Sequence, residues 1–587
     1  MNTSAPPIAI ASLAAAIALS ACSDQPAPFL SDHPDTEWVE QTLAGLSLEQ
    51  KIGQLITSDL DLRVEGALGF NMDRWVSLAR DHGLGMFVLY GGTPTTVPTL
   101  LNQLQGEAEI PILFSVDFEG GPGQQVAGAT EYPANMAFAA IGDEDLMYRA
   151  TSAAAVEGRA MGLHLTYTPV VDVSLRPDNP AESVRSFGGD VDLLGRMVRS
   201  YVSGYHDNGM LTSAKHFPGR GDVEPMREYP NFNANNKLAA DVVAYDFRAF
   251  GLAIEAGVDF VMTEHVAVPA VTDGSDLPAS VEGKLSFGWL RDSLGFDGVL
   301  TTDDLWYDHV VARFGTEDVA VKAFEAGHDV ILKPRDPVAT IAAMADAVRS
   351  GRISEERVHE AVRKLLSLKS RLNLHNHRLV NAEAVSEFVG TPEHLAIAQE
   401  VADRSLTLLK NDGVLPVTGD QAATAVNINV QKLEDDPSPS VLAEQLETAF
   451  PGIQNFTLRP GTESSEYSFI RQAVDQASLV VLSFFVQRDK LGDATPIRDS
   501  DLEFIRSVIT AKPGGVVAMA YGNPHIIREI SDVPAFLVGY GERGWFGNQP
   551  VYFESFIKAL TGNIEPSGRL PVTVSDEYDI GSGLGYH

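Results

Sequence analysis

Two adjacent carboxylates, Asp303 and Asp304, end the short apolar run Gly298–Thr302. Successive side chains of a strand point to opposite sides, so only one of the two can face a cavity. A carboxylate at a cavity mouth can attack an anomeric carbon and form a covalent glycosyl ester. The other reading of the pair is structural: Asp304 caps the following helix and Asp303 has no further role.

A cation and an imidazole lie side by side at the end of another apolar run, Leu211–Lys215. Lys215 and His216 are followed by Phe217-Pro218-Gly219, whose Pro-Gly pair predicts a turn. A lysine and a histidine in this position predict a polar site at the mouth of a cavity.

Short apolar runs alternate with helical patterns from about residue 45 to 375, which predicts a parallel sheet with crossover helices. The predicted strands are Gln54–Thr57, Met86–Tyr90, Ile110–Val116, His164–Val171, Leu211–Lys215, Asp259–Met262, Gly298–Thr302 and Asp329–Leu332. Eight such units predict an α/β fold, a TIM-like (β/α)8 barrel, whose active site lies at the carboxyl ends of the strands. Polar residues gather at or just past those ends: Asp117, Asp172, Lys215, His216, Glu264, His265, Asp303 and Lys333.

The 587 residues exceed what one core holds, so we predict further domains. The predicted organisation is a signal peptide over 1–22, a tether over 23–40, the barrel over 41–375, a linker over 376–395 and a smaller α/β sandwich over 396–587. The predicted strands of the sandwich are Leu406–Leu409, Ala425–Val430, Val480–Phe485, Val516–Tyr521 and Ala535–Gly539.

The amino terminus predicts a lipid-anchored protein of the cell envelope, on a periplasmic or outer surface. The apolar run Ile8–Leu19 is too short to span a bilayer and leads into Leu19-Ser20-Ala21-Cys22, which resembles a bacterial lipobox. Cys22 is the only cysteine, so we expect it to carry the lipid. The alternatives are secretion without a lipid anchor and an amino terminus that starts in the cytoplasm.

The formal charge of −36, from 43 basic and 79 acidic residues, argues against nucleic acid or an anionic membrane surface as a partner. We therefore expect membrane contact only through the lipid anchor. The histidines are scattered and have no cysteine partners, and no glycine-rich phosphate loop follows a strand, so we predict no metal site and no cofactor.

Several segments together resemble glycoside hydrolase family 3, in particular its β-N-acetylglucosaminidase branch. The resemblance covers about residues 45 to 587 and is carried by these segments: Val116-Asp117-Phe118-Glu119-Gly120-Gly121, Glu157-Gly158-Arg159-Ala160-Met161-Gly162, Pro169-Val170-Val171-Asp172-Val173, Arg185-Ser186-Phe187-Gly188, Lys215-His216-Phe217-Pro218-Gly219, Met262-Thr263-Glu264-His265, Thr302-Asp303-Asp304-Leu305, Asp403-Arg404-Ser405-Leu406 and Pro566-Ser567-Gly568-Arg569. It implies that Asp303 is the nucleophile and that a carbohydrate is the substrate. The substrate-binding residues it implies are Asp117, Arg159, Arg185, Lys215, His216 and His265.

The chain departs from that branch where the proton donor is expected. Relatives read His at position 220 and Asp-Ser-His over 226–228, whereas this chain has Arg220 and Met226-Arg227-Glu228. Glu228 is our candidate acid/base. The alternatives are Glu264, a carboxylate of the second domain (Glu463, Glu466 or Asp493), or no effective acid. A second departure, Pro122-Gly123-Gln124 after Gly121, removes a positive charge that relatives often carry near the sugar.

The resemblance implies a retaining exo-β-glycosidase that acts on terminal N-acetyl-β-D-glucosaminides of peptidoglycan or chitin fragments. The alternatives within the enzyme class are a β-glucosidase or β-xylosidase with an acid from the second domain, and glycosyl transfer to an acceptor other than water. A lipid-anchored glycan-binding protein with weakened catalysis is the alternative outside it.

Overall fold

The computed structural model describes residues 30–31, 33–63, 71–176, 182–221, 223, 233–419, 423–432, 436–486, 497–541 and 550–586. The predicted signal peptide with Cys22 lies outside these residues, as do positions 23–29 and 32 of the predicted tether. Lipidation of Cys22 therefore stays a prediction. None of the described helices is long and apolar enough to cross a membrane.

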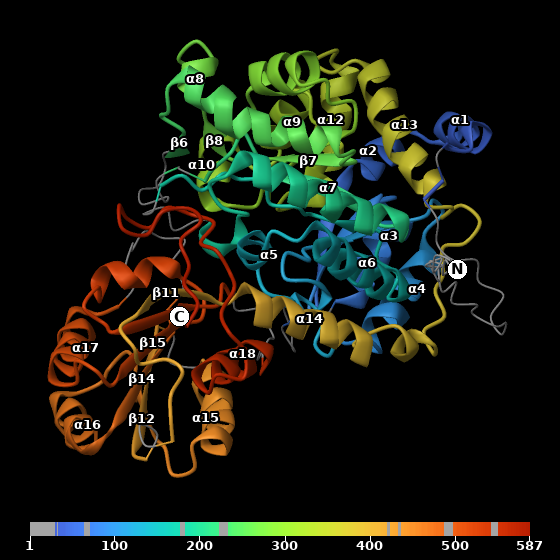
Figure 1. Cartoon of the computed structure of the whole chain (residues 1–587). Coiled ribbons are helices and arrows are strands. Elements are labelled where there is room, and N and C mark those ends of the chain that lie inside the picture. Colours follow the sequence, from blue (N-terminus) through green and yellow to red (C-terminus); the bar gives the residue numbers. More distant parts are fainter. Residues whose placement is uncertain are drawn as a thin grey trace, which may run out of the picture.

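Eight parallel strands close into a barrel, which confirms the predicted fold (Figure 1). Each strand pairs with the next around the ring, β10 pairs with β1, and a bridge between Thr301 and Val330 joins the two ends of the sheet. The strands are β1 Ile56–Asp61, β2 Met86–Tyr90, β3 Leu113–Val116, β4 Leu165–Thr166, β5 Leu211–Phe217, β7 Phe260–Thr263, β9 Val299–Thr302 and β10 Ile331–Leu332.

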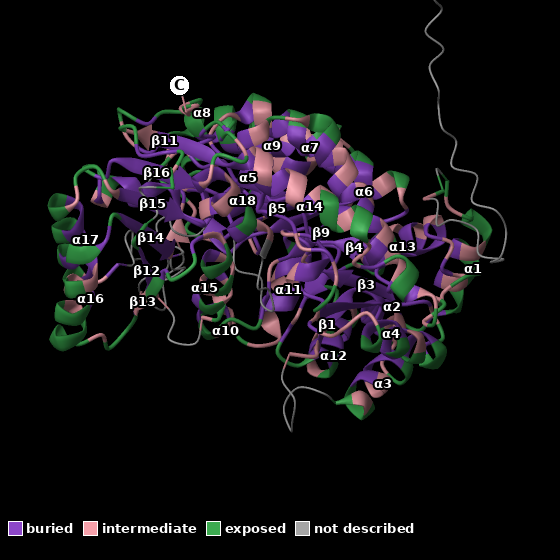
Figure 2. Ribbon diagram, turned by 60° about the horizontal axis from the view of Figure 1, so that its bottom comes forward, coloured by how far each residue is buried: buried purple, intermediate pink, exposed green. Residues whose placement is uncertain are grey.

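Helices surround this barrel and bury its outer face (Figure 2). They are α2 Leu48–Gln54, α3 Met72–Arg80, α4 Thr96–Glu107, α6 Glu144–Ala160, α7 Val191–Asp207, α9 Arg248–Glu255, the π-helical segment η5 Lys284–Ser293, α11 Asp318–Glu325, α12 Pro337–Arg349 and α13 Glu355–Arg371. Three leucines of α13 and its end, Leu365, Leu368 and Leu372, pack in one cluster with the first residues of several strands, such as Met86 and Leu211. The predicted helix over Ser354–Leu372 therefore closes the amino end of the barrel and leaves the carboxyl end for chemistry.

The first predicted strand begins too early. Gln54 belongs to α2, because the capping box between Ser47 and Gln50 starts a helix that continues to Gln54, and β1 begins only at Ile56. The apolar run alone did not separate the end of this helix from the strand that follows it.

The second part of the chain folds into a six-stranded mixed sheet between two layers of helices. Its strands are β11 Thr407–Asn411, β12 Ala425–Gln431, β13 Gln454–Leu458, β14 Leu479–Phe485, β15 Val516–Ala520 and β16 Ala535–Val538, and only β11 runs antiparallel to its neighbour. Its helices are α14 Pro392–Ser405, α15 Ser438–Ala449, α16 Ser464–Gln476, α17 Asp499–Ala511 and α18 Pro550–Leu560. The sequence did not predict β13, an edge strand whose first residues are exposed and polar.

Helix α14 joins the two parts of the molecule (Figure 1). It begins inside the predicted linker 376–395, where Thr391 caps its first turn. On the barrel side, Glu400 pairs with Arg149 at 2.9 Å and Arg404 pairs with Asp143 at 2.8 Å. On its other side, α14 packs on α18 of the second domain.

Gly188 lies where the barrel contacts the carboxyl-terminal segment of the second domain. Its φ of +105° lies in the left-handed region, and a Cβ there would come 2.2 Å from the carbonyl oxygen of Pro571. The neighbouring amide of Gly189 donates to the same oxygen at 3.0 Å. A side chain at this position must therefore push the two domains apart.

We expect Gly188→Ala to lower the melting temperature. The left-handed backbone costs about 1–2 kcal/mol for alanine, and overpacking against Pro571 adds about 1–3 kcal/mol. The matched control is Gly142→Ala, which also has a positive φ (+68°) but meets nothing within 4 Å. Equal melting temperatures for the two variants would show that the contact with Pro571 does not limit stability.

Candidate active site

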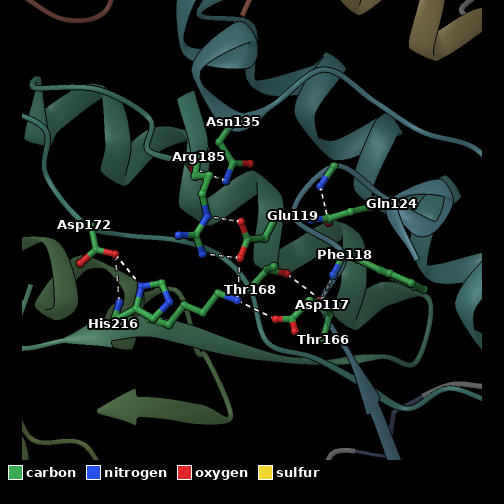
Figure 3. A network of polar contacts seen from close by, with 12 residues as sticks. Asp117, Phe118, Glu119, Gln124, Asn135, Thr166, Thr168, Asp172, Arg185 and His216 are labelled. Carbon is green, nitrogen blue, oxygen red and sulfur yellow. Dashed lines mark hydrogen bonds and ion pairs between the residues drawn. The ribbon is translucent and has the colours of Figure 1, made fainter. Parts of the chain in front are cut away.

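The predicted polar residues converge at the carboxyl end of the barrel. Asp117 follows β3, Lys215 and His216 lie in β5, Glu264 follows β7 and Asp303 follows β9. Asp172 joins them from the segment after β4, where it accepts a hydrogen bond from His216. Because the strands are parallel, their ends meet on one face, and Figure 3 shows part of this cluster.

Lys215 and Arg185 share one buried carboxylate, Glu119. Figure 3 shows the contact between Arg185 and Glu119. Lys215 Nζ lies 2.6 Å from Asp117 Oδ1 and 2.7 Å from Glu119 Oε1, while Arg185 donates to both oxygens of Glu119 at 2.6 and 2.8 Å. Burial opposes the charge of Glu119, but Arg185 and Lys215 hold its pKa well below the usual range. Asp117 keeps 22% of its side chain exposed against 4% for Lys215, so Asp117 is the member of this group that faces solvent.

His216 is oriented by Asp172. His216 Nδ1 lies 2.8 Å from Asp172 Oδ2, and the other oxygen of Asp172 accepts the backbone N–H of Arg220 at 2.8 Å. Burial, and next the charge of Glu182, raise the pKa of Asp172 well above its ordinary value. The contact with Asp172 thus fixes the imidazole. The ring lies beside Asp303, because polar atoms of His216, Glu264 and Asp303 all lie within 4.8 Å of one another.

Asp303 is held at the strand end by its own backbone and by its neighbour. Its N–H donates to the Thr263 carbonyl at 2.8 Å, and its Oδ1 accepts the N–H of Asp304 at 2.7 Å. Burial, followed by the charge of Glu264, raises the pKa of Asp303 above the ordinary value. A partly buried carboxylate that is held in this way within the cluster can act as a nucleophile, which agrees with the role implied for Asp303.

Arg220 makes Glu264 a poor proton donor. Arg220 forms ion pairs with both Glu182 and Glu264, and Glu264 Oε1 also accepts the backbone N–H of His265 at 2.7 Å. Burial would raise the pKa of Glu264, but the Arg220 charge outweighs it and the pKa is lowered. The alternative prediction that Glu264 is the acid is therefore disfavoured, because a donor must hold its proton near the working pH.

Two predicted substrate-binding residues, Arg159 and His265, form hydrogen bonds within the protein. Arg159 donates to the carbonyl of Leu163 at 3.0 Å, just before β4, and so lies at the amino end of the barrel, where burial lowers its pKa to about 10. His265 places Nδ1 2.8 Å from Ser280 Oγ and Nε2 3.0 Å from the carbonyl oxygen of Asp304. Their predicted sugar contacts stay predictions, and His265 contacts the backbone next to Asp303.

Two of the second-domain acid candidates serve the fold. Glu463 and Glu466 form a reciprocal capping box at the start of α16, which occupies both carboxylates locally. Glu228 and Asp493 lie outside the described residues, so their predicted roles stay predictions.

Three members of the site had no role predicted from the sequence. Glu119 could have been found, because it lies two residues after Asp117 in the segment Val116–Gly121 that resembles the family. Glu182 gave no signal, since it lies in a loop without periodicity. Lys333 was predicted only as a strand-end residue; its Nζ lies 2.9 Å from Asp304 Oδ2, and burial raises the pKa of Asp304 to about 6.

The carboxylates of the site do not favour a metal ion. Two groups have ligand atoms within 4.8 Å of one another: Asp172, Glu182 and His216, and His216, Glu264 and Asp303. Each group contains a carboxylate that is already paired with Arg220. A divalent cation would have to compete with that guanidinium at close range.

Comparison with known proteins agrees with this geometry. Residues 47–368 match the glycosyl hydrolase family 3 N terminal domain. A β-N-acetylglucosaminidase/β-glucosidase from Cellulomonas fimi is 30% identical over 571 residues, which cover 93% of this chain and 97% of the relative.

Solved structures share the fold. A family 3 β-N-acetylglucosaminidase from Paenibacillus sp. is 28% identical with a TM-score of 0.77, and the match covers 90% of this chain and 99% of that one. The β-glucoside phosphorylase BglX bound to 2FGlc is 22% identical with a TM-score of 0.81 over 93% of this chain and 99% of that one, a likeness of fold. The chain therefore belongs to glycoside hydrolase family 3, a family of glycosidases.

Proposed function

We propose that this protein is a retaining exo-β-glycosidase that forms a covalent intermediate on Asp303. The observation that carries the proposal is the partly buried Asp303 carboxylate, held by backbone contacts within a cluster of fixed polar side chains. Asp117, Arg185, Lys215 and His216 would bind the hydroxyls of the terminal sugar. Asp117 pairs with Lys215, while Glu119 holds Arg185 and Asp172 holds His216. These contacts fix the four side chains before a sugar arrives, which reduces the cost of ordering them on binding.

The proposed substrate is a terminal N-acetyl-β-D-glucosaminide from peptidoglycan or chitin fragments. The Phe217-Pro218-Gly219 continuation supports this branch, as does the C. fimi relative, whose name includes this activity. The same name also includes β-glucosidase, so a β-glucoside is the second candidate.

Glu228 is the proposed proton donor. A sugar alkoxide leaves slowly unless it is protonated, and a retaining pair places two carboxyls about 5–5.5 Å apart. The ion pairs of Arg220 with Glu182 and Glu264 support this choice indirectly, because they keep Glu264 ionised.

The sugar is tested by the ratio of kcat/KM for an aryl N-acetyl-β-D-glucosaminide to that for the matching β-glucoside. We expect a ratio far above one, and a loss of at least about 10³-fold in Asp303→Ala, because the nucleophile acts together with the rest of the site. A ratio below one would assign the enzyme to β-glucosides. Activity on neither substrate above the Asp303→Ala background would contradict the proposed function.

Proton donation by Glu228 predicts a dependence on the leaving group. Glu228→Gln should lower kcat/KM for a disaccharide by about 10²–10⁴-fold. It should affect an activated aryl glycoside much less, because that aglycone leaves without protonation. Glu224→Gln, four residues earlier, is the control. Equal losses on both substrates in Glu228→Gln would remove Glu228 from the role of acid.

The charge of Glu264 predicts a shift in the pH profile. Asp303 must be ionised to attack, so activity is lost as the pH falls through its raised pKa. Glu264→Gln removes a charge that raises this pKa and leaves the charge of Arg220, which lowers it. The acid limb of kcat/KM for an activated aryl glycoside should therefore move to lower pH. Glu325→Gln on the outer helix α11 should leave the limb in place, and a shift of the Glu264→Gln limb to higher pH would refute this account.

A further inference from the structure

A buried carboxylate, Asp246, lies behind the turn that carries Arg220. Asp246 belongs to η3 Val242–Phe247, a π-helical segment that leads into α9, and it is 1% exposed. An ionised carboxylate is costly to bury unless it is paired and hydrogen-bonded. Segments of π-helix are rare and often occur at functional sites. The partners of Asp246 therefore show what this carboxylate holds in place.

Asp246 contacts the turn directly. The backbone of Gly219, the residue before Arg220, packs so closely on the carboxylate that a Cβ there would lie 2.8 Å from Asp246 Oδ1. Lys237 Nζ lies 3.0 and 2.9 Å from the two carboxylate oxygens, and Asn235 Nδ2 donates to Oδ2 at 3.1 Å. One carboxylate thus connects the turn after β5 with a segment that comes later in the chain.

Asn235 continues this connection to the segment that follows β7. Its N–H donates to the Ala267 carbonyl at 2.8 Å. The residues before it form β6 Asn233–Ala234, which pairs in parallel with β8 Val266–Ala267 (Figure 1). Strand β8 begins two residues after Glu264. The contacts of the carboxylate therefore join the segment of one ion-pair partner to the segment of the other.

Aromatic packing fixes η3 against the same turn. Phe247, the neighbour of Asp246, stacks on Phe217 with centroids 5.4 Å apart, and its ring lies 4.8 Å from that of Trp289. The carbonyl of Phe217 accepts the N–H of Glu264 at 2.7 Å. The π-helical segment is thus a packed support from which Asp246 can hold the turn.

We propose that Asp246 is a positioning residue that keeps Arg220 against Glu264 beside the nucleophile. Asp246 acts through Arg220 rather than on the substrate, because the ion pair between Arg220 and Glu264 forms only while their two segments keep one arrangement. The proposal rests on the proposed glycosidase function and adds to it a residue outside the cluster of charges.

The position of Arg220 can be read from the ionisation of Asp303. Burial and the charge of Glu264 raise the pKa of Asp303, whereas His265 and Arg220 lower it. If Arg220 moves away, the pKa of Asp303 rises further. Because Asp303 must be ionised to attack, activity is then lost at a higher pH on the acid side. The charged and titratable groups around Asp303 are His216, Arg220, Glu264, His265, Asp304, Tyr307 and His309.

The test measures the acid limb of kcat/KM for an activated aryl glycoside in Asp246→Asn. The limb should move to higher pH by up to about 1 unit, because an opposite charge close to a carboxyl lowers its pKa by about 1–3 units. Arg220→Gln should move the limb at least as far. Asp246→Asn should add nothing in the Arg220→Gln background, since its effect passes through Arg220. An unmoved limb, or shifts that add in the double variant, would overturn the proposal.

Asp329→Asn is the matched control. Asp329 is also 1% exposed and pairs with Arg291 and Arg357, but it lies before β10 at the amino end of the barrel. The control should lower the melting temperature and leave the limb in place, and an equal shift in both variants would reduce Asp246 to a structural role. If Asp246→Asn does not fold, Lys237→Gln removes one partner of the carboxylate and should give a smaller shift in the same direction. No shift in that variant would also overturn the proposal.

Hydrogen exchange separates this proposal from the proposed function. If the wild-type protein cleaves neither aryl glycoside, the proposed function fails, and the exchange of backbone N–H groups over residues 216–221 and 264–267 then decides on Asp246. Faster exchange there in Asp246→Asn, but not in Asp329→Asn, supports the positioning role. Unchanged exchange, or an equal rise in both variants, overturns it.

Discussion

The candidate site depends on a row of buried and partly buried charges of alternating sign across the mouth of the barrel. The row runs Asp117, Lys215, Glu119, Arg185, Glu182, Arg220, Glu264, with each cation between two carboxylates. An isolated buried charge costs several kcal/mol, and its removal from a pair leaves a partner uncompensated. The members therefore hold one another in place, although they come from β5, from the segments after β3, β5 and β7, and from the segment before α7.

The sequence was sufficient for the barrel and for the members of the site that follow its strands. Apolar runs separated by helical patterns predicted all eight strands, and parallel strands bring their carboxyl ends to one face. This is why strand order and chain direction alone predicted that Asp117, Lys215, His216 and Asp303 lie together. The bounds were less certain where apolar residues continue from a helix into a strand, as at Gln54.

The ion pairs of the site could not be predicted, because they join residues far apart in the chain. Arg220 contacts Glu182 and Glu264 over separations of 38 and 44 residues, and neither partner is implied by local spacing. Arg159 shows the converse case, in which the segment could be identified but the position of the side chain could not. It stands in a segment that resembles the family, yet the segment ends α6, and the end of that helix lies at the amino side of the barrel, beside Leu163. Resemblance identified the segment but not the direction of its side chain.

Arginine at position 220 changes the electrostatics around the nucleophile. An arginine stays protonated at every working pH, so Glu264 remains an anion beside Asp303. That anion and burial raise the pKa of Asp303, while Arg220 and His265 partly offset the rise. A carboxylate with a raised pKa is the stronger base and nucleophile once ionised, but it is protonated over a wider acid range.

The proton donor must still carry its proton at the pH where Asp303 has lost its own, so the pKa of the donor must lie above that of Asp303. The substitution at position 220 therefore constrains the acid as well as the nucleophile, and a carboxyl near Asp303 with its own raised pKa would meet this constraint.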